Sequence, residues 1–158
     1  MSELTFILQK GEKIIADVKR CVYAGVGYIT SGSGIGTQFG NTGMAGGLFS
    51  SKQIKREGSI FDSKPTHIYL TNKRIVFCNA KISLFGLSEE EVGSIFSEIP
   101  FNLIKGINKS SKLGAPAVDI SVTNSNGSID NIKFWFAGAL GGREEERDSF
   151  LEKIKKQL

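Results

Sequence analysis

A glycine-rich tract is the first feature of this sequence that could bind a ligand. Seven glycines fall among residues 32–47, and glycine-rich turns often hold nucleotide phosphates. Gly32 and Gly34 begin like the dinucleotide-binding pattern, but Thr37 stands where its third glycine would be and no helical pattern follows. No Gly-Lys-Ser/Thr closes the tract as in a Walker loop. The spacing therefore argues against a nucleotide site, and we expect no cofactor.

The same tract has the composition of a contact loop. Residues 21–51 contain no charged side chain, and a basic segment follows directly. Apolar beside basic side chains suit a contact with an anionic membrane, because partial burial and headgroup attraction add. The alternative is that the apolar side chains pack on the domain itself or on a second copy of the chain. The expected contact residues are Phe39, Met44, Leu48 and Phe49, and the expected ligand-binding residues of the basic segment are Lys52, Lys55 and Arg56.

Side chains suited to acid–base, nucleophilic or metal chemistry are few. His67 is the single histidine, so any Ser-His or Cys-His pair would have to use it. Cys21 and Cys78 lack the paired spacing of a zinc site and are too few for a disulfide scaffold. The acidic runs at 89–91 and 144–146 are more typical of solvated helix starts than of paired catalytic carboxylates. We therefore expect neither an enzyme nor a metal site.

Residues 66–78 give the strongest local signal for the elements that would position these side chains. Two runs rich in β-branched and aromatic residues flank Asn72-Lys73, which predicts a hairpin with a two-residue turn. In that register His67 faces Cys78, and the two faces of the hairpin separate cleanly. One face holds Ile68, Leu70, Ile75 and Phe77, and the other holds Tyr69, Arg74 and Val76.

Other segments predict further strands. From Arg20 apolar and polar residues alternate, which predicts a strand. Separate strands are predicted over residues 95–107, 118–123 and 132–136, and Pro100 marks an edge or a bend. In the first of these strands the alternation places Val22, Ala24, Val26 and Tyr28 on one side. In the last, Trp135 points away from Phe134 and Phe136.

Two helices are predicted at the ends of the chain. Residues 2–10 predict a short helix, because Leu4, Ile7 and Leu8 share a helical face and Gly11 ends the pattern. Residues 143–158 predict an amphipathic helix with acids in its first turns and lysines in its last, as the helix dipole favours. The buried stripe of the second helix is expected to be Phe150, Leu151, Ile154 and Leu158.

Three segments carry a resemblance to a known family. They are residues 8–15, with a Gly-Glu pair before an apolar strand; residues 68–77, with Leu-Thr-Asn-Lys-Arg in a hairpin; and residues 99–107, which begin with Ile-Pro. In these the chain resembles the pleckstrin-homology-like superfamily, in particular its GRAM and bacterial PH-like branch. It departs from that pattern in a Gly-rich insertion around 31–58, between the first strand and the hairpin.

The resemblance implies a fold and a function. The fold is mainly β (α+β): a PH-like bent antiparallel β-sandwich, or partly open barrel, of about seven strands closed by a C-terminal amphipathic helix. Such domains are usually non-enzymatic and dock on phosphoinositide-rich membranes or on protein partners. Lys73 and Arg74, at the hairpin, are added to the expected ligand-binding residues, since a guanidinium suits a headgroup phosphate. For Arg74 the resemblance implies a structural role first, with contact to a headgroup phosphate as the alternative.

Composition sets the remaining expectations. A chain of 158 residues with a net charge of +4 fits a single domain over 1–158 and does not indicate a nucleic-acid binder. The N-terminus lacks a signal peptide, so we expect a cytoplasmic protein that associates peripherally with membranes. We expect a binding module for an anionic, phosphoinositide-type membrane surface or for a protein partner. The alternative is a structural protein that self-associates through the insertion and its sheet edges, as a homo-oligomer.

Overall fold

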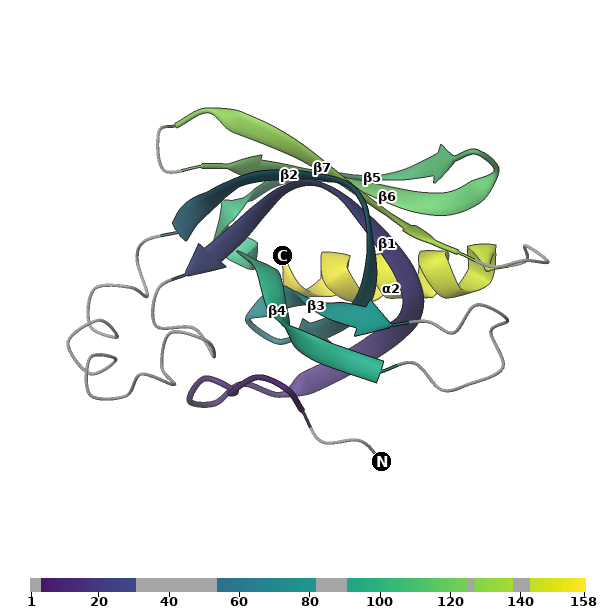
Figure 1. Cartoon of the computed structure of the whole chain (residues 1–158). Coiled ribbons are helices and arrows are strands. Elements are labelled where there is room, and N and C mark those ends of the chain that lie inside the picture. The colour runs from purple at the N-terminus through teal and green to yellow at the C-terminus, as the bar shows by residue number, and fades with distance from the viewer. Residues whose placement is uncertain (1–3, 31–53, 82–90, 125–126, 138–142) are drawn as a thin grey trace.

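The computed structural model describes residues 4–30, 54–81, 91–124, 127–137 and 143–158. The chain is mainly β, as predicted, with one α-helix at the C-terminal end of the described residues (Figure 1). The elements are β1 (Ile14–Thr30), β2 (Ile54–Thr71), β3 (Arg74–Lys81), β4 (Glu91–Pro100), the short 3-10 helix η2 (Phe101–Leu103), β5 (Ile104–Lys112), β6 (Ala115–Thr123), β7 (Ile129–Phe136) and α2 (Glu144–Gln157).

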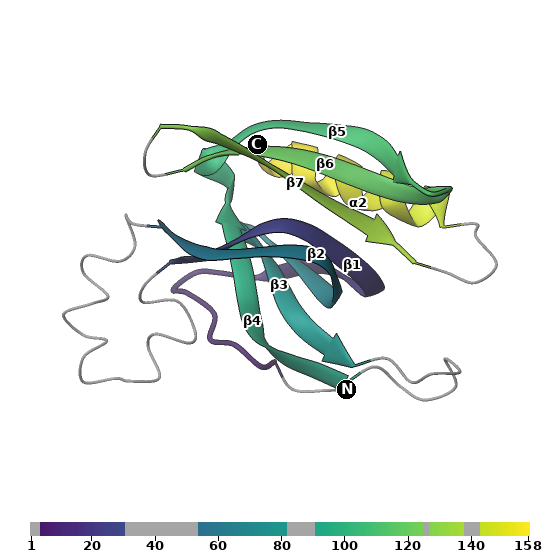
Figure 2. The same ribbon diagram turned by 45° about the horizontal axis from the view of Figure 1, so that its top comes forward.

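All seven strands belong to one antiparallel sheet in the order β4-β3-β2-β1-β7-β6-β5. The sheet bends into two layers, one containing β1 to β4 and the other containing β5 to β7 with α2 (Figure 2). Its edges are β4 and β5. Pro100, predicted to mark an edge or a bend, ends the edge strand β4 and is followed by η2. A proline fits there because an edge strand does not need every backbone N–H.

A β-bulge at Gly25 gives β1 its bend. The register between β1 and β2 shifts between Tyr23 and Gly25. Gly25 has a φ of +127°, a backbone conformation that residues other than glycine rarely adopt. The shift moves the buried face from Cys21 and Tyr23 to Val26 and Tyr28. The prediction that Val22, Ala24, Val26 and Tyr28 share one side is therefore wrong, because the bulge interrupts the alternation between Ala24 and Val26.

The predicted hairpin is confirmed pair by pair. Residues Ile68, Tyr69 and Leu70 face Phe77, Val76 and Ile75, and His67 faces Cys78. The inner face joins the main core, which α2 covers with Phe150, Leu151 and Ile154, as predicted. Leu158 is exposed instead, because α2 ends at Gln157. Phe150 packs edge-on against Phe134 and Phe136, so Trp135 lies on the opposite face of β7, as predicted.

The predicted N-terminal helix is not found: residues 4–13 contain no helix. In place of the expected Leu4–Ile7–Leu8 face, Phe6 is the most buried side chain of residues 4–10, and it packs in a second apolar cluster on the outer face of the sheet. Its ring lies 5.2 Å from that of Tyr69. Thr5 donates a hydrogen bond to the carbonyl of Gly93 at 2.5 Å. These long-range contacts hold the segment extended across the sheet, where a helix could not make them.

Candidate functional site

The predicted ligand-binding residues divide between the two ends of β2. Lys55 and Arg56 stand on the last rungs of the β1–β2 ladder, opposite Ile29 and Tyr28. Lys73 lies in the turn at the other end of β2. Four predicted contact residues and one predicted ligand-binding residue lie outside the described residues: Phe39, Met44, Leu48, Phe49 and Lys52. The basic residues proposed from the sequence therefore do not form one cluster.

Arg74 is buried, with 1% of its side chain exposed, and it forms the centre of an internal ion-pair network. Its Nε and Nη2 donate to the two carboxylate oxygens of Glu12 at 2.8 and 3.0 Å, and its Nη1 donates to Glu98 at 3.0 Å. Nη2 also donates to the carbonyl of Ile7 at 3.1 Å. The guanidinium lies 5.5 Å from the ring centre of Phe6. This arrangement supports the structural role for Arg74, since a guanidinium so enclosed has little surface to offer a ligand.

The network keeps its charges in spite of burial. Burial by itself raises the pKa of the Glu12 carboxyl, but hydrogen bonds from Arg74, the Gln9 N–H and Thr71, with the charge of Arg74, hold the pKa below its ordinary value. Burial likewise lowers the pKa of Arg74, and the two carboxylates more than reverse that effect. The folded state therefore holds a buried, charged guanidinium against the ionised carboxylate of Glu12 at neutral pH.

The turn after β2 is tied to the segment before β1. Asn72 accepts a hydrogen bond from the Lys13 N–H at 2.7 Å, and its own N–H donates to the Lys13 carbonyl at 3.1 Å. Its side-chain amide donates to the Gly11 carbonyl at 3.1 Å. Gly11 permits the tight turn before Lys13 through its φ of +76°. These bonds bring Lys10, Lys13 and Lys73, which are all exposed, onto one part of the surface.

Apolar side chains lie on the same part of the surface. Ile7, Ile14 and Ile15 are 52%, 36% and 37% exposed. Ile14 faces Thr71 across the β1–β2 ladder, one residue from Asn72, and the Ile7 carbonyl is held by Arg74. Sequence reasoning missed Lys10, Lys13 and the isoleucines. The Gly-Glu pair at residues 11–12 was a signal for the segment, but nothing local showed that Asn72 would hold it.

His67 and Cys78 do not form a nucleophile–base pair. The ring Nε2 of His67 lies 2.9 Å from the carboxylate of Asp17, and the thiol sulfur of Cys78 lies 3.8 Å from the hydroxyl oxygen of Thr5. Burial raises the pKa of the Cys78 thiol to about 12. A thiol with that pKa is protonated at neutral pH and is a poor nucleophile.

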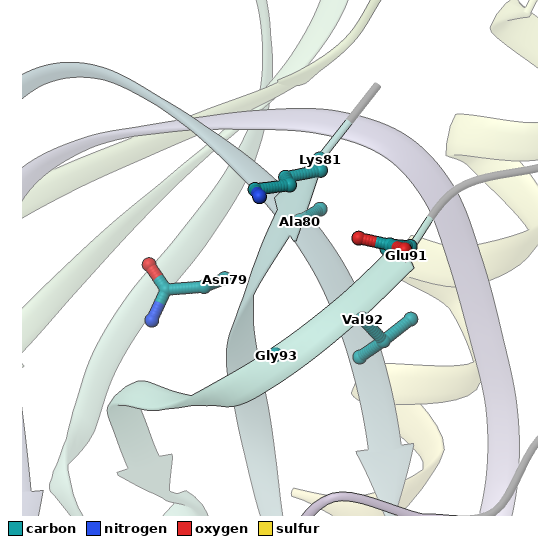
Figure 3. A pocket seen from close by; sticks show the side chains of 6 residues that line it. All are labelled: Asn79, Ala80, Lys81, Glu91, Val92 and Gly93. Carbon is teal, nitrogen blue, oxygen red and sulfur yellow. The ribbon is translucent and has the colours of Figure 1, made fainter. Parts of the chain in front are cut away.

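A hollow of about 350 Å³ lies where β3 ends and β4 begins (Figure 3). Lys81 and Glu91 face each other on the last described rung between these strands, and Ala80 faces Val92 on the rung before it. Its lining holds no member of the Arg74 network. The residues around it are Asn79, Ala80, Lys81, Glu91, Val92 and Gly93. An opposed lysine and glutamate on strand ends is a common cross-strand pair and does not indicate a ligand.

Trp135 lies half-buried on the outer face of β7, and Lys112 lies over its ring at 5.7 Å from the ring centre. On the same face Lys133 pairs with Asp119 at 3.1 Å. These contacts occupy both lysines within the domain. Neither the exposure of Trp135 nor the local charge therefore marks this face as a binding surface.

The described residues hold no group of three or more His, Cys, Asp and Glu side chains placed to bind a metal ion. Among them, no helix combines the length and the apolar character needed to cross a membrane. No model of a protein family matches the chain, and no curated protein does so.

Proposed function

We propose that the chain is a PH-like, GRAM-type binding module that docks on an anionic membrane surface and carries out no covalent chemistry. The hairpin sequence at residues 68–77 supports this reading, because it is the most specific of the segments that resemble the family. A bent sheet of seven antiparallel strands with a C-terminal helix packed on its inner face is compatible with that resemblance. Fold alone does not name a ligand, so the ligand is argued from the surface.

The observation that carries the proposal is the presence of basic and apolar residues together where β2 ends; where β2 begins, the same combination is given by the sequence alone. At one end Lys55 and Arg56 stand on the last rungs before the segment that contains Phe39, Met44, Leu48 and Phe49. At the other end Lys73 lies beside Lys10, Lys13 and three exposed isoleucines. Amphipathic surfaces of this kind bind bilayers by combining headgroup attraction with shallow apolar insertion.

Vesicle sedimentation at two salt concentrations tests the proposal. The full chain is mixed with vesicles of phosphatidylcholine alone and with vesicles that also contain phosphatidylserine or a phosphoinositide. We expect binding only to the anionic vesicles, weakened at high salt because counter-ions screen the attraction. A chain that stays in the supernatant with every anionic composition at low salt does not have this function.

Self-association through sheet edges is the second candidate. The edges that could pair are β4 and β5, and β5 carries Lys105, Lys109 and Lys112. Repeated lysines on an edge strand disfavour pairing with an identical strand. Light scattering across a concentration series separates the two candidates, since a concentration-dependent oligomer without vesicle binding would favour self-association.

A further inference from the structure

We propose that the membrane contact is the surface around the β2–β3 turn, formed by Lys10, Lys13, Lys73, Ile7, Ile14 and Ile15, and that it binds the phosphate-bearing headgroups of an anionic bilayer. We call these residues the turn surface. The inference rests on the proposed function, and it selects one end of β2 as the docking end. The other end, with Lys52, Lys55 and Arg56, is then not the primary contact.

The turn surface carries an excess of positive charge. Within the part of the chain that the structure describes, the ammonium groups of Lys10, Lys13 and Lys73 make no ion pair, whereas Lys109 and Lys133 each pair with an aspartate. Arg74, which follows Lys73, holds the carboxylates of Glu12 and Glu98. Even with both carboxylates ionised, one guanidinium against them leaves a charge of only −1 to set against the three exposed positive charges. The turn surface therefore keeps a positive excess for an anionic ligand.

The turn surface also exposes isoleucine side chains to solvent. Three exposed isoleucines lie within the turn surface, whereas Leu113 and Ile129, which are more exposed, lie elsewhere on the described part of the chain, and Ile7 is about half exposed. Free phosphate or a soluble phosphate ester would make no use of isoleucine side chains. A bilayer would, since each side chain that enters the interface is removed from water while the lysines remain at headgroup level. The combination therefore favours a lipid surface over a soluble anion.

The turn surface is pre-organised for binding. The backbone that carries Lys10, Lys13 and Lys73 is fixed by the three hydrogen bonds of Asn72 and by the bidentate pair between Arg74 and Glu12. A surface already held in its binding geometry loses less conformational entropy when it binds. Glu12 and Arg74 are thus positioning residues for the contact and do not touch the ligand themselves.

Two charge-matched variants of the full chain test the inference against vesicles that contain phosphatidylserine. Lys10→Gln/Lys13→Gln/Lys73→Gln removes three charges from the turn surface, and Lys52→Gln/Lys55→Gln/Arg56→Gln removes three from the opposite end of β2. We expect the first to lose about 100-fold in vesicle affinity, since each basic residue near an anionic membrane contributes about fivefold. We expect the second to lose less than about tenfold, through net charge alone.

A third variant, Lys153→Gln/Lys155→Gln/Lys156→Gln on α2, measures the same change of net charge away from both ends of β2. Ile7→Ser tests the apolar part, and we expect weaker binding whose salt dependence is unchanged. Circular dichroism and thermal unfolding check that each variant is folded. If the wild-type chain binds and the turn-surface variant binds equally well, the inference is wrong and the proposed function stands. If the wild-type chain does not bind, both are wrong.

Discussion

Arg74 is the residue that holds the segment before β1 against the hairpin. It ties Ile7 and Glu12, which precede β1, to Glu98 in β4, and it stands at the first position of β3. A buried ion pair contributes little net stability compared with apolar residues of the same shape, but removal of one partner leaves an uncompensated charge. Its loss should therefore be far more damaging than the loss of its exposed neighbour.

Arg74→Ala should lower the free energy of unfolding by about 3–5 kcal/mol, because Glu12 and Glu98 remain buried without their cation. Lys73→Ala, one residue away and exposed, should change it by no more than about 0.5 kcal/mol. Urea denaturation of the two variants measures both values. A loss below about 1 kcal/mol for Arg74→Ala would mean that the network does not hold the N-terminal segment in place.

Glu12 gives the network a predictable pH dependence. Its pKa in the folded state lies below its unfolded value, so the unfolded chain binds more protons and this carboxylate stabilises the fold at neutral pH. The contribution is complete above the unfolded value of about 4.3 and is lost as the pH falls through the lower folded value. Glu12→Gln should be less stable than wild type at pH 7 and should lose less stability between about pH 5 and 3.

Denaturation midpoints measured across that pH range make the comparison. Glu152→Gln, at an exposed position of α2, serves as the matched control and should keep the wild-type slope. Parallel pH curves for wild type and Glu12→Gln would contradict the assignment of an ionised Glu12 in the fold.

The sequence predicted the face of the hairpin on which Arg74 lies, but not its burial. Local alternation placed it correctly on the face with Tyr69 and Val76, and that face is usually solvated in a two-layer protein. Its burial depends on Glu12, which lies 62 positions earlier, and on a segment whose helical pattern was misleading. Contacts over such separations leave no trace in local periodicity.

At the scale of elements, local pattern succeeded where one period applied to the whole element. The hairpin and α2 follow periods of 2 and 3.6 and were predicted in type, and the hairpin in register as well. The predicted alternation of the first strand was wrong after Gly25, because a bulge reverses which side chains face the core. A single sequence does not distinguish a bulge glycine from a turn glycine. The helix prediction for the N-terminal segment was wrong because Phe6 packs against side chains of the sheet.

Gly25 should be the glycine of the described strands least tolerant of substitution. A Cβ there would lie 3.2 Å from the Asn131 carbonyl oxygen and from the Ile132 Cα of β7, in addition to its unfavourable φ. Gly25→Ala should lower the free energy of unfolding by about 1–3 kcal/mol. Thermal and chemical unfolding measure the loss.

Gly106→Ala is the matched control in β5, because a Cβ at Gly106 meets no atom within 4 Å. It should be close to neutral. Equal stability of the two alanine variants would show that β1 can bend past β7 without the glycine.

At the scale of the whole molecule, β2 separates two basic regions that appear as one list of residues in the sequence. Lys55 and Arg56 pair near the start of β2, and Lys73 follows its end. The two basic regions are separate only in the folded chain, and the same fold places Lys10 and Lys13 near Lys73. The docking end is therefore a property of the assembled sheet, and it calls for a measurement on the unmodified chain.

Lysine acetylation read by mass spectrometry tests the central claim most directly. The wild-type chain is labelled in solution and while bound to vesicles that contain phosphatidylserine. Lys10, Lys13 and Lys73 should become protected on the vesicles, while Lys153 and Lys155, exposed on α2, should label equally in both states. Protection of Lys52 and Lys55 with unchanged labelling of Lys10, Lys13 and Lys73 would contradict the assignment of the turn surface as the docking end.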